Sequence, residues 1–187
     1  MTLSDNELII NANNGDVLAF EELIYRYDKM VLRLAFKYTG DVDDAKDIYQ
    51  EVFIRVFKNL SRFQFKSEFS TWLFRVASNV CISFKRKYNK VNHISLNDDD
   101  ESSFVTEIPE DSKLLPDNLV VNNEFGDKIS KALGTLSPNQ KMSFLLKHYE
   151  GYKIREIADI MDCKEGTIKK YLFEAVRKLK TQLEGSY

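Results

Sequence analysis

Apolar residues recur at helical spacing from residue 17 to residue 57 of this chain. The first run follows Asp16, a residue type that caps helix N-termini, and it stops at Gly40, which favours a C-terminal cap. In its first turns the spacing i, i+3, i+4 and i+7 predicts a buried face of Phe20, Leu23, Ile24 and Tyr27. We therefore expect one long helix that continues through Tyr38.

A second helix is predicted directly after this cap. It opens with Asp41, Asp43 and Asp44, whose carboxylates favour the exposed amides and the macrodipole of a helix N-terminus. The same periodicity continues to the end of this run. Its predicted inward residues are Ala45, Ile48, Val52, Ile54, Val56 and Phe57.

The periodicity breaks across residues 61–69 and resumes in a third helix that begins at Ser70 or Thr71. Its predicted inward residues are Trp72, Leu73, Val76, Val80 and Phe84, and it ends in basic residues. Residues 91–122 then lack periodicity. They contain the acidic run NDDDESS and two prolines, which exclude regular helix around themselves, so we predict a linker.

The rest of the chain predicts four shorter helices. The second of them opens at Ser137, where Ser at the N-cap, Pro at N1 and Gln at N3 form a capping box. The third runs from Ile154 to Met161, and after a turn near Asp162 the fourth runs from Glu165 to about residue 183. The inward residues predicted for the four are Phe125, Ile129 and Leu133; Phe144, Leu145 and His148; Ile154, Ile157, Ala158 and Met161; and Ile168, Leu172, Ala175, Val176 and Leu179.

These elements predict the all-α class, with two small helical domains joined by a flexible acidic linker. Only 7 Gly and 3 Pro occur in 187 residues, which favours long helices over a β fold rich in turns. We place the domains at residues 1–90 and 121–187 and the linker at residues 91–120. The charge follows this division, because the net charge is +2 over residues 1–90, −7 over 91–122 and +3 over 123–187. A local positive face attracts phosphate whatever the net charge of −2.

Several classes of function are disfavoured. Cys81 and Cys163 lie far apart in apolar helical patterns, so we interpret both as core residues and expect no disulfide or zinc site. His93 and His148 are isolated, and no phosphate-binding loop, dinucleotide fingerprint or metalloprotease motif occurs. We therefore expect neither an enzyme nor a cofactor. The N-terminus does not resemble a secretory signal and no apolar run approaches about 20 residues, so we expect no membrane insertion and a cytoplasmic location.

The last two helices have the pattern of a helix-turn-helix, a short helix followed by a turn and a longer helix. The residues predicted to project from the outer face of the second are Thr167, Lys169, Lys170, Tyr171 and Glu174. Side chains of these types suit base edges in the major groove of DNA. An antiparallel helix pair with a solvated charged face stays open as an alternative.

Aromatic residues lie beside basic ones in two stretches between residues 61 and 90, SRFQFKSEFSTWLFRVASN and FKRKYNK. Such a mixture suits unpaired bases, because aromatic rings stack on bases while Lys and Arg hold the backbone. For Phe53, Trp72 and Phe74 a place in the core is favoured instead, and for the loop phenylalanines Phe63, Phe65 and Phe69 both interpretations stay open. A polar face of Asp47, Gln50 and Glu51 on the second helix is either solvated or a docking surface for a protein.

These three features in this order resemble the extracytoplasmic-function (group 4) sigma factors of bacterial RNA polymerase. DAKDIYQEVFIRVF resembles the polymerase-binding helix, FSTWLFRVASNVCISFKRK the helix of the −10 element, and the segment from LSPNQ to AVRKL the C-terminal helix-turn-helix. The resemblance covers both lobes. A relation to the clostridial toxin-gene sigma subgroup stays open.

The resemblance implies a partner or DNA element for each set of residues. Core RNA polymerase would be bound, at the largest-subunit clamp and the flap, with Asp47, Gln50, Glu51 and Arg55 at the clamp. The −10 element, as melted non-template strand, would be contacted by Phe63, Phe65, Lys66, Ser67, Phe69, Trp72, Arg75, Asn79, Lys85, Arg86 and Lys87. Duplex −35 DNA would be contacted by Lys164, Glu165, Thr167, Lys169, Lys170, Tyr171, Glu174 and Arg177. An anti-sigma factor is a further implied partner.

The chain departs from the family's usual pattern at a few positions. Ser83 stands where the family usually has Asp, and Asp162 stands where it usually has Gly in the turn. The recognition helix is also poorer in Arg than is usual, so the upstream DNA sequence is not carried over from better-known members. A stand-alone helix-turn-helix regulator that binds duplex DNA, or a helical adaptor that binds none, stays open as an alternative.

Overall fold

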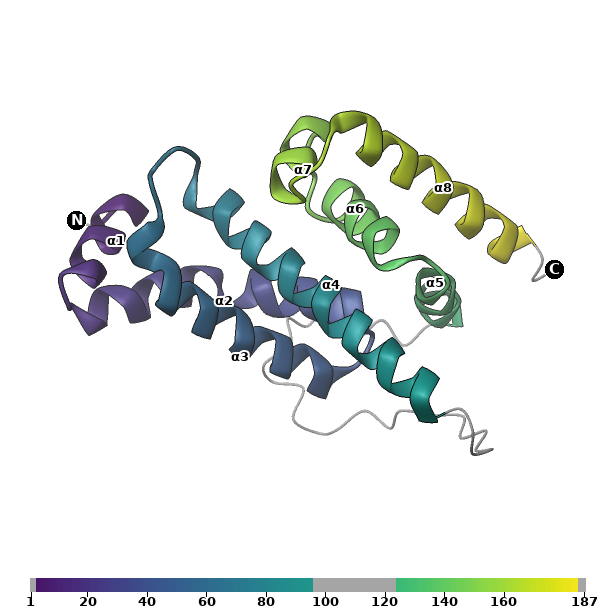
Figure 1. Ribbon diagram of the computed structural model, residues 1–187, viewed down its shortest axis with the longest axis horizontal. Coiled ribbons are helices and arrows are strands. Elements are labelled where there is room, and N and C mark those ends of the chain that lie inside the picture. The colour runs from purple at the N-terminus through teal and green to yellow at the C-terminus, as the bar shows by residue number, and fades with distance from the viewer. Residues whose placement is uncertain (1–2, 96–123, 185–187) are drawn as a thin grey trace.

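The computed structural model describes residues 3–95 and 124–184 (Figure 1). Every regular element within these residues is a helix, which confirms the predicted all-α class. The N-terminal lobe comprises α1 (Asp5–Asn13), α2 (Val17–Thr39), α3 (Val42–Asn59), the 3-10 turn η1 (Leu60–Arg62) and α4 (Phe69–Ser95). The C-terminal lobe comprises α5 (Glu124–Gly134), α6 (Pro138–His148), α7 (Ile154–Ile160) and α8 (Glu165–Glu184).

The helix ends are set by the capping residues that the sequence predicts. The Asp16 carboxylate accepts from the backbone N–H of Ala19, and Gly40 ends α2 in the left-handed conformation at φ 80°. Asp41 caps α3 by accepting from two backbone amides of its first turn. Each cap satisfies amides or carbonyls that a helix end would otherwise leave without a partner.

The core of the N-terminal lobe confirms most of the predicted inward residues but not all of them. On α3, Ala45, Ile48, Val52 and Val56 are buried. Ile54 and Phe57 were predicted to face inward, and this is wrong because their side chains are 47% and 68% exposed. Ile54 lies on the side of α3 opposite its buried residues, and Phe57 lies at the margin of the core, where its ring touches Phe20 of α2 but stays largely exposed.

The segment after α4 is described only in part. The helix runs from Phe69 to Ser95 and so extends into the segment for which we predicted a linker. The remainder of that linker, residues 96–120, lies outside the described residues.

The C-terminal lobe also follows its predicted caps. Ser137 and Gln140 form the capping box of α6, with Pro138 as its first residue. The turn between α7 and α8 places Asp162 at φ 50°, in the left-handed region that Asp tolerates. Two predicted inward residues are wrong, because His148 and Val176 are exposed.

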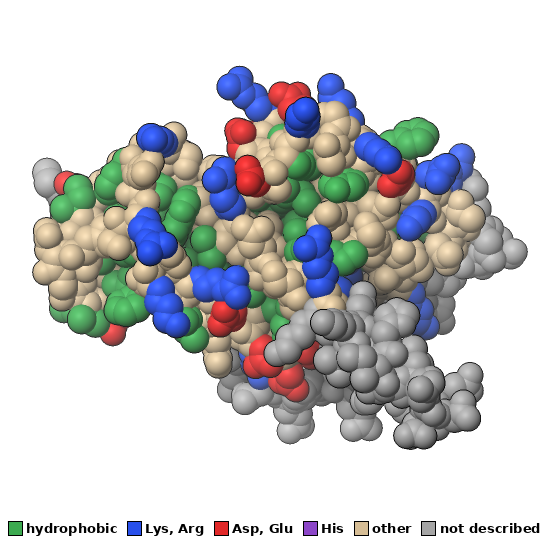
Figure 2. All heavy atoms as spheres, viewed as in Figure 1, with side chains coloured by type: hydrophobic (Ala, Val, Ile, Leu, Met, Phe, Trp, Pro, Cys, Tyr) green, Lys and Arg blue, Asp and Glu red, His purple; other side chains and the backbone are tan. Residues whose placement is uncertain are grey.

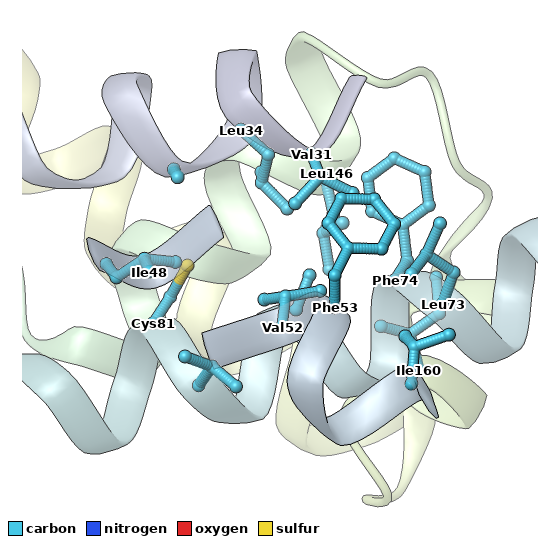
Figure 3. Close-up of a cluster of buried hydrophobic side chains, with 14 of the residues drawn as sticks. Val31, Leu34, Ile48, Val52, Phe53, Leu73, Phe74, Cys81, Leu146 and Ile160 are labelled. Atoms are coloured by element: carbon cyan, nitrogen blue, oxygen red, sulfur yellow. The ribbon is translucent and has the colours of Figure 1, made fainter. Parts of the chain in front are cut away.

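The two lobes pack against each other. One cluster of buried side chains contains residues of α2, α3 and α4 together with Leu145, Leu146, Ile157, Ile160 and Ile168 of the C-terminal lobe. Figure 3 shows Leu146 and Ile160 in the same cluster as Val31, Phe53 and Phe74. No local pattern of residues predicts this contact, because it joins segments far apart in the chain.

Two further observations concern the described residues alone. None of their helices is long and apolar enough to cross a membrane. Nor do three or more of their His, Cys, Asp and Glu side chains gather where they could hold a metal ion.

Candidate protein and nucleic-acid interfaces

The outer face of α3 carries a continuous exposed stripe. Asp47 and Gln50 are exposed and Glu51 is half-buried, so the structure brings these three predicted residues together on one face. Glu51 accepts from Arg55 Nε at 2.6 Å, an i, i+4 ion pair at the surface. Such a pair adds little stability but orients both side chains.

The stripe becomes apolar towards the end of α3. Ile54 and Phe57 follow Glu51 at helical spacing and are exposed, and the Phe57 ring packs edge-on against Phe20 at 5.2 Å. Single exposed apolar side chains are common on protein surfaces, but Ile54 and Phe57 lie one turn apart and together make an apolar patch beside the carboxylates. Helical periodicity predicts both apolar residues in the core, and this part of the surface is therefore not predictable from the spacing.

The loop between η1 and α4 is anchored by an aromatic cluster. Phe63 and Phe69 are buried, and their rings lie 5.5 Å and 5.6 Å from that of the half-buried Trp72. Phe65 is 44% exposed, packs on Phe63 and has φ 55°. A bulky residue with positive φ is strained. Of the three loop phenylalanines, the structure thus presents only Phe65 to solvent, while Phe53 and Phe74 are buried as favoured.

A depression of about 300 Å³ lies beside this cluster. Its lining combines Trp72 and Val76 with four polar residues: Arg55, Asn59, Arg62 and Asn79. Arg55 comes from the end of α3, Arg62 from η1 and Asn79 from α4, so three elements converge here. Two guanidinium groups, two amides and one indole can together bind a phosphate, the edge of a base and its face.

The remaining downstream residues are spread along the loop and α4. Lys66, Ser67, Asn79 and Arg86 are exposed, and Lys85 is half-buried. Arg75 is exposed but its guanidinium donates to the backbone carbonyl of Asp159 in α7 at 2.5 Å. The side chain of Lys87 lies outside the described part of the structure.

The predicted upstream residues divide between two sides of α8. Five of them are exposed, namely Lys164, Glu165, Lys169, Lys170 and Arg177, and Thr167 is half-buried. Tyr171 and Glu174 turn towards α6 instead. The Tyr171 hydroxyl accepts from Asn139 at 3.3 Å, and the Glu174 carboxylate accepts from the amide of Gln140 at 2.7 Å.

An exposed aromatic residue on α8 was missed. Phe173 is 69% exposed and lies one helical turn beyond Lys169 and Lys170, and Val176 follows at 49%. A single apolar side chain on a charged face breaks no periodicity, so only its position beside the lysines could have identified it. Figure 2 shows Lys and Arg side chains spread over the face on which α4 and α8 lie, with acidic side chains among them.

Comparison with known proteins matches both lobes. The profile of sigma-70 region 2 matches residues 23–91, and that of sigma-70 region 4 matches residues 126–179. The chain is 29% identical over 179 residues to the ECF RNA polymerase sigma-E factor of Escherichia coli (strain K12), covering 92% of this chain and 91% of that protein. It is 28% identical over 185 residues to the ECF RNA polymerase sigma factor SigW of Bacillus subtilis (strain 168), covering 98% of each chain.

Solved structures share the fold. The sigma factor RpoE, solved in complex with the anti-sigma factor NepR from Bartonella quintana, has a TM-score of 0.67 at 23% identity and covers 90% of this chain and 98% of its own. CnrH, solved in complex with the cytosolic domain of CnrY, has a TM-score of 0.68 at 18% identity and covers 98% of this chain and 99% of its own.

Proposed function

This chain belongs to the extracytoplasmic-function (ECF) sigma factors of RNA polymerase, and from that membership we propose which part of each lobe binds polymerase and which binds promoter DNA. As a sigma factor it is not an enzyme, and it directs promoter recognition and transcription initiation by binding core polymerase and promoter DNA. We assign residues 1–90 to sigma domain 2 and residues 121–187 to sigma domain 4, with residues 91–120 as the linker.

We propose that the exposed stripe of α3 docks on the clamp of the largest polymerase subunit. The stripe offers a carboxylate end at Asp47 and Glu51 and an apolar end at Ile54 and Phe57. The charged end gives orientation and a fast encounter, and the apolar end gives buried area. The flap would be bound by the C-terminal lobe.

The observation that carries the DNA assignment is the depression between α3, η1 and α4. Its Arg, Asn and Trp side chains match what a single unpaired nucleotide offers, namely a phosphate, a base edge and a base face. We therefore move Arg55 from the polymerase set to the DNA set, and we add Asn59 and Arg62. Phe65 is the loop residue proposed to stack on a neighbouring base of the −10 non-template strand.

We propose that α8 enters the major groove of the −35 element. The exposed lysines and Arg177 would contact phosphates, and Phe173 would contact a thymine methyl group, the apolar feature of that groove. Glu174 is held by Gln140, so we now assign it to support α8 and not to read a base.

The remaining expectations are proposals of the same kind. The structural relative RpoE was solved with the anti-sigma factor NepR, and on this likeness we propose that an anti-sigma factor binds this chain. Because polymerase and DNA are its partners, we propose that it acts in the bacterial cytoplasm. The relatives compared above are sigma-E and SigW factors, which lends no support to the clostridial subgroup.

Run-off transcription tests these assignments. Purified core polymerase would transcribe a pool of genomic promoter fragments from the source organism with and without the protein, and discrete transcripts that depend on the protein are expected. The variant Trp72→Phe keeps an aromatic wall and should retain them, whereas Arg62→Gln and Asn79→Ala should weaken binding to single-stranded −10 DNA while leaving polymerase binding unchanged. Equal DNA binding by all variants would contradict the assignment of the depression.

A further inference from the structure

The loop between η1 and α4 is closed at its base by two buried rings. Phe63 follows η1 and Phe69 opens α4, and their rings meet edge-on at 5.8 Å between centres. Between them in the chain, Phe65 is exposed and packs on Phe63 at 5.0 Å. Its φ of 55° is costly for a phenylalanine, and such strain persists only where the surroundings hold the backbone in place. The exposed ring is therefore presented only while the two buried rings keep their positions.

The buried rings are held from two sides. Trp72, less than one turn further along α4, lies 5.6 Å from Phe69 between ring centres. On α2, Tyr27 packs edge-on against Phe69 at 5.3 Å. Trp72 belongs to the same helix as Phe69. Among the described residues, Tyr27 is thus the ring that joins the start of α4 to another α-helix.

The position of the Tyr27 ring is set by α1. Its hydroxyl donates to the carboxylate of Asp5, the first residue of that helix. The same carboxylate accepts from Arg26 Nη1 at 2.9 Å, and Arg26 Nη2 donates to the backbone carbonyl of Leu3 at 2.7 Å. Burial, together with the hydrogen bond to Asp5, raises the pKa of the Tyr27 hydroxyl, so this group keeps its proton and remains a donor. Arg26 therefore orients the Asp5 carboxylate, and the carboxylate orients the ring.

These contacts form one path from α1 to the exposed ring of the loop. The path runs from Asp5 through Tyr27, Phe69 and Phe63 to Phe65. Figure 1 shows α1 at the same end of the N-terminal lobe as this loop, and α1 also contacts η1. A carboxylate with a purely structural role would stabilise the lobe as a whole. The path instead predicts an effect confined to the loop.

We propose that Asp5 is a positioning residue for recognition of the −10 element. Through Tyr27 and Phe69 it fixes the loop in the conformation that presents Phe65 to an unpaired base. The inference rests on the proposed stacking of Phe65 on the −10 non-template strand. Neither Asp5 nor Tyr27 belongs to the proposed polymerase or DNA sets, so α1 acts as a support for the loop and touches neither partner.

Removal of either partner tests the hydrogen bond. The probe is a single-stranded oligonucleotide with the −10 sequence of a promoter identified by run-off transcription, titrated into the holoenzyme. Asp5→Ala and Tyr27→Phe should each weaken its binding about fivefold, because apparent affinity falls with the population of the binding-competent loop. The double variant should lose no more than either single variant, because both remove the same bond. Asp5→Asn keeps an acceptor for the Tyr27 hydroxyl and should bind within about twofold of the wild type.

A spectroscopic signal separates positioning from general stability. Trp72 is the only tryptophan of the chain and packs on both buried rings, so its fluorescence reports on this cluster. In the free protein, Asp5→Ala should shift the emission to longer wavelength and increase its quenching by acrylamide, whereas Asp5→Asn should change neither.

The matched control is Ile48→Val, which removes one buried carbon from α3 about three turns before the end of that helix. It should lower stability without changing the Trp72 emission or the binding of the oligonucleotide. Binding of duplex −35 DNA and of core polymerase should be the same in all these variants and the wild type.

The outcomes separate failure of this inference from failure of the proposed function. If Phe65→Ala bound the oligonucleotide as tightly as the wild type, the proposed stacking would be wrong and the inference would fall with it. If Phe65→Ala bound weakly while Asp5→Ala and Tyr27→Phe bound like the wild type, Asp5 would not be a positioning residue, and the proposed function would stand. Equal losses in Ile48→Val and Asp5→Ala would also overturn the inference, because they would show a general effect of stability.

Discussion

The two lobes differ in how much of their core they supply themselves. The N-terminal lobe buries side chains from α1, α2, α3, η1 and α4 in a cluster that its own helices largely fill. Among its described side chains, the C-terminal lobe has a separate cluster of three buried ones, Leu133, Leu136 and Ala175, whereas seven others belong to the cluster of the N-terminal lobe: Met142, Leu145, Leu146, Ile157, Ala158, Ile160 and Ile168. The C-terminal lobe therefore relies on α2 and α4 for part of its stability, as small domains do when their own core is limited.

The two lobes also differ in how many polar side chains they bury. Ser78 is the one buried polar side chain among the described residues of the N-terminal lobe, whereas the C-terminal lobe buries Gln140 and Ser143. Gln140 caps α6 and also donates to Glu174 of α8, so it joins two helices. Apolar packing therefore stabilises the N-terminal lobe. The C-terminal lobe depends in addition on polar contacts between its helices and on packing against the N-terminal lobe.

The largest expected effect is on the apolar packing of the N-terminal lobe. Phe63→Ala should lower the free energy of unfolding by about 3–5 kcal/mol, because it empties a buried site between Phe69 and Trp72. Phe65→Ala, two residues away and exposed, should leave unfolding nearly unchanged and weaken single-stranded −10 DNA binding by about 1–3 kcal/mol. Urea denaturation and DNA titration of both variants measure the two effects. A large loss of stability in Phe65→Ala would contradict the division between the two rings.

The same loop shows what the sequence alone could predict. Helix caps depend on neighbours three or four residues away, so Asp16, Gly40 and the capping box at Ser137 were predicted correctly. Whether an apolar side chain is buried depends on helices distant in sequence, and periodicity therefore failed at Ile54, where α3 is apolar on both sides. For the loop phenylalanines the sequence left both interpretations open, and only three-dimensional packing separates them.

The proposed site was predictable to a similar extent. The stripe on α3 and the exposed lysines of α8 follow from helical spacing. The depression lined by Arg55 and Arg62 does not, because it joins α3, η1 and α4, and the short η1 turn has no pattern of its own. The contact between the lobes has no local signal either, since Arg33 and Glu150, which form an ion pair across it, are 117 residues apart.

The second prediction concerns the exposed stripe of α3, which belongs to the N-terminal lobe. Asp47→Lys with Glu51→Lys reverses the charged end of the α3 stripe and should abolish measurable polymerase binding, an effect of about 2–3 kcal/mol or more, because like charges replace complementary ones. Binding of duplex −35 DNA should not fall. A pull-down with core polymerase and a duplex titration measure both.

The matched control is Glu21→Lys with Asp159→Lys. Both residues are exposed, one on α2 and one on α7, and the change in net charge is the same. The control should bind polymerase like the wild type. If it lost binding equally, the effect would come from net charge and not from α3.

The third prediction concerns a cation of the C-terminal lobe that is buried against the N-terminal lobe. Burial, aided by Lys85, lowers the pKa of Lys141 to about 8, and its ammonium lies 5.7 Å from the centre of the Tyr38 ring. Between about pH 8 and the usual value of 10.5 the unfolded chain binds more protons, so stability should rise with pH across this window. Lys141→Met should stabilise the protein at pH 7 by on the order of 3 kcal/mol, because the pKa falls from 10.5 to about 8 and each pKa unit corresponds to about 1.36 kcal/mol.

The variant Lys141→Met also separates the pH dependence of stability caused by Lys141 from the opposite pH dependence caused by Cys81. Burial raises the pKa of the nearby Cys81 thiol to about 12, which makes stability fall as pH rises above about 9 in both proteins. The difference between wild type and Lys141→Met removes that common contribution. Denaturation at pH 7, 8.5 and 10 should show this difference shrinking with pH, and a difference that stayed constant would refute the assignment to Lys141.

The smallest expected effect concerns the DNA-contacting face of α8 in the C-terminal lobe. The variant tests whether an exposed side chain there contributes to DNA binding and not to stability. Phe173→Ala removes a side chain that is 69% exposed, so the free energy of unfolding should change by less than about 0.5 kcal/mol. Affinity for −35 duplex DNA should fall by about 1 kcal/mol, because an apolar contact with a thymine methyl group is lost.

Ala175→Val, at a fully buried position on the opposite side of α8, should reverse this pattern by overpacking the small cluster and lowering stability. If Phe173→Ala lowered stability instead of DNA affinity, α8 would be using this ring for packing, and the polar contacts of Gln140 would not be enough to hold the lobe together.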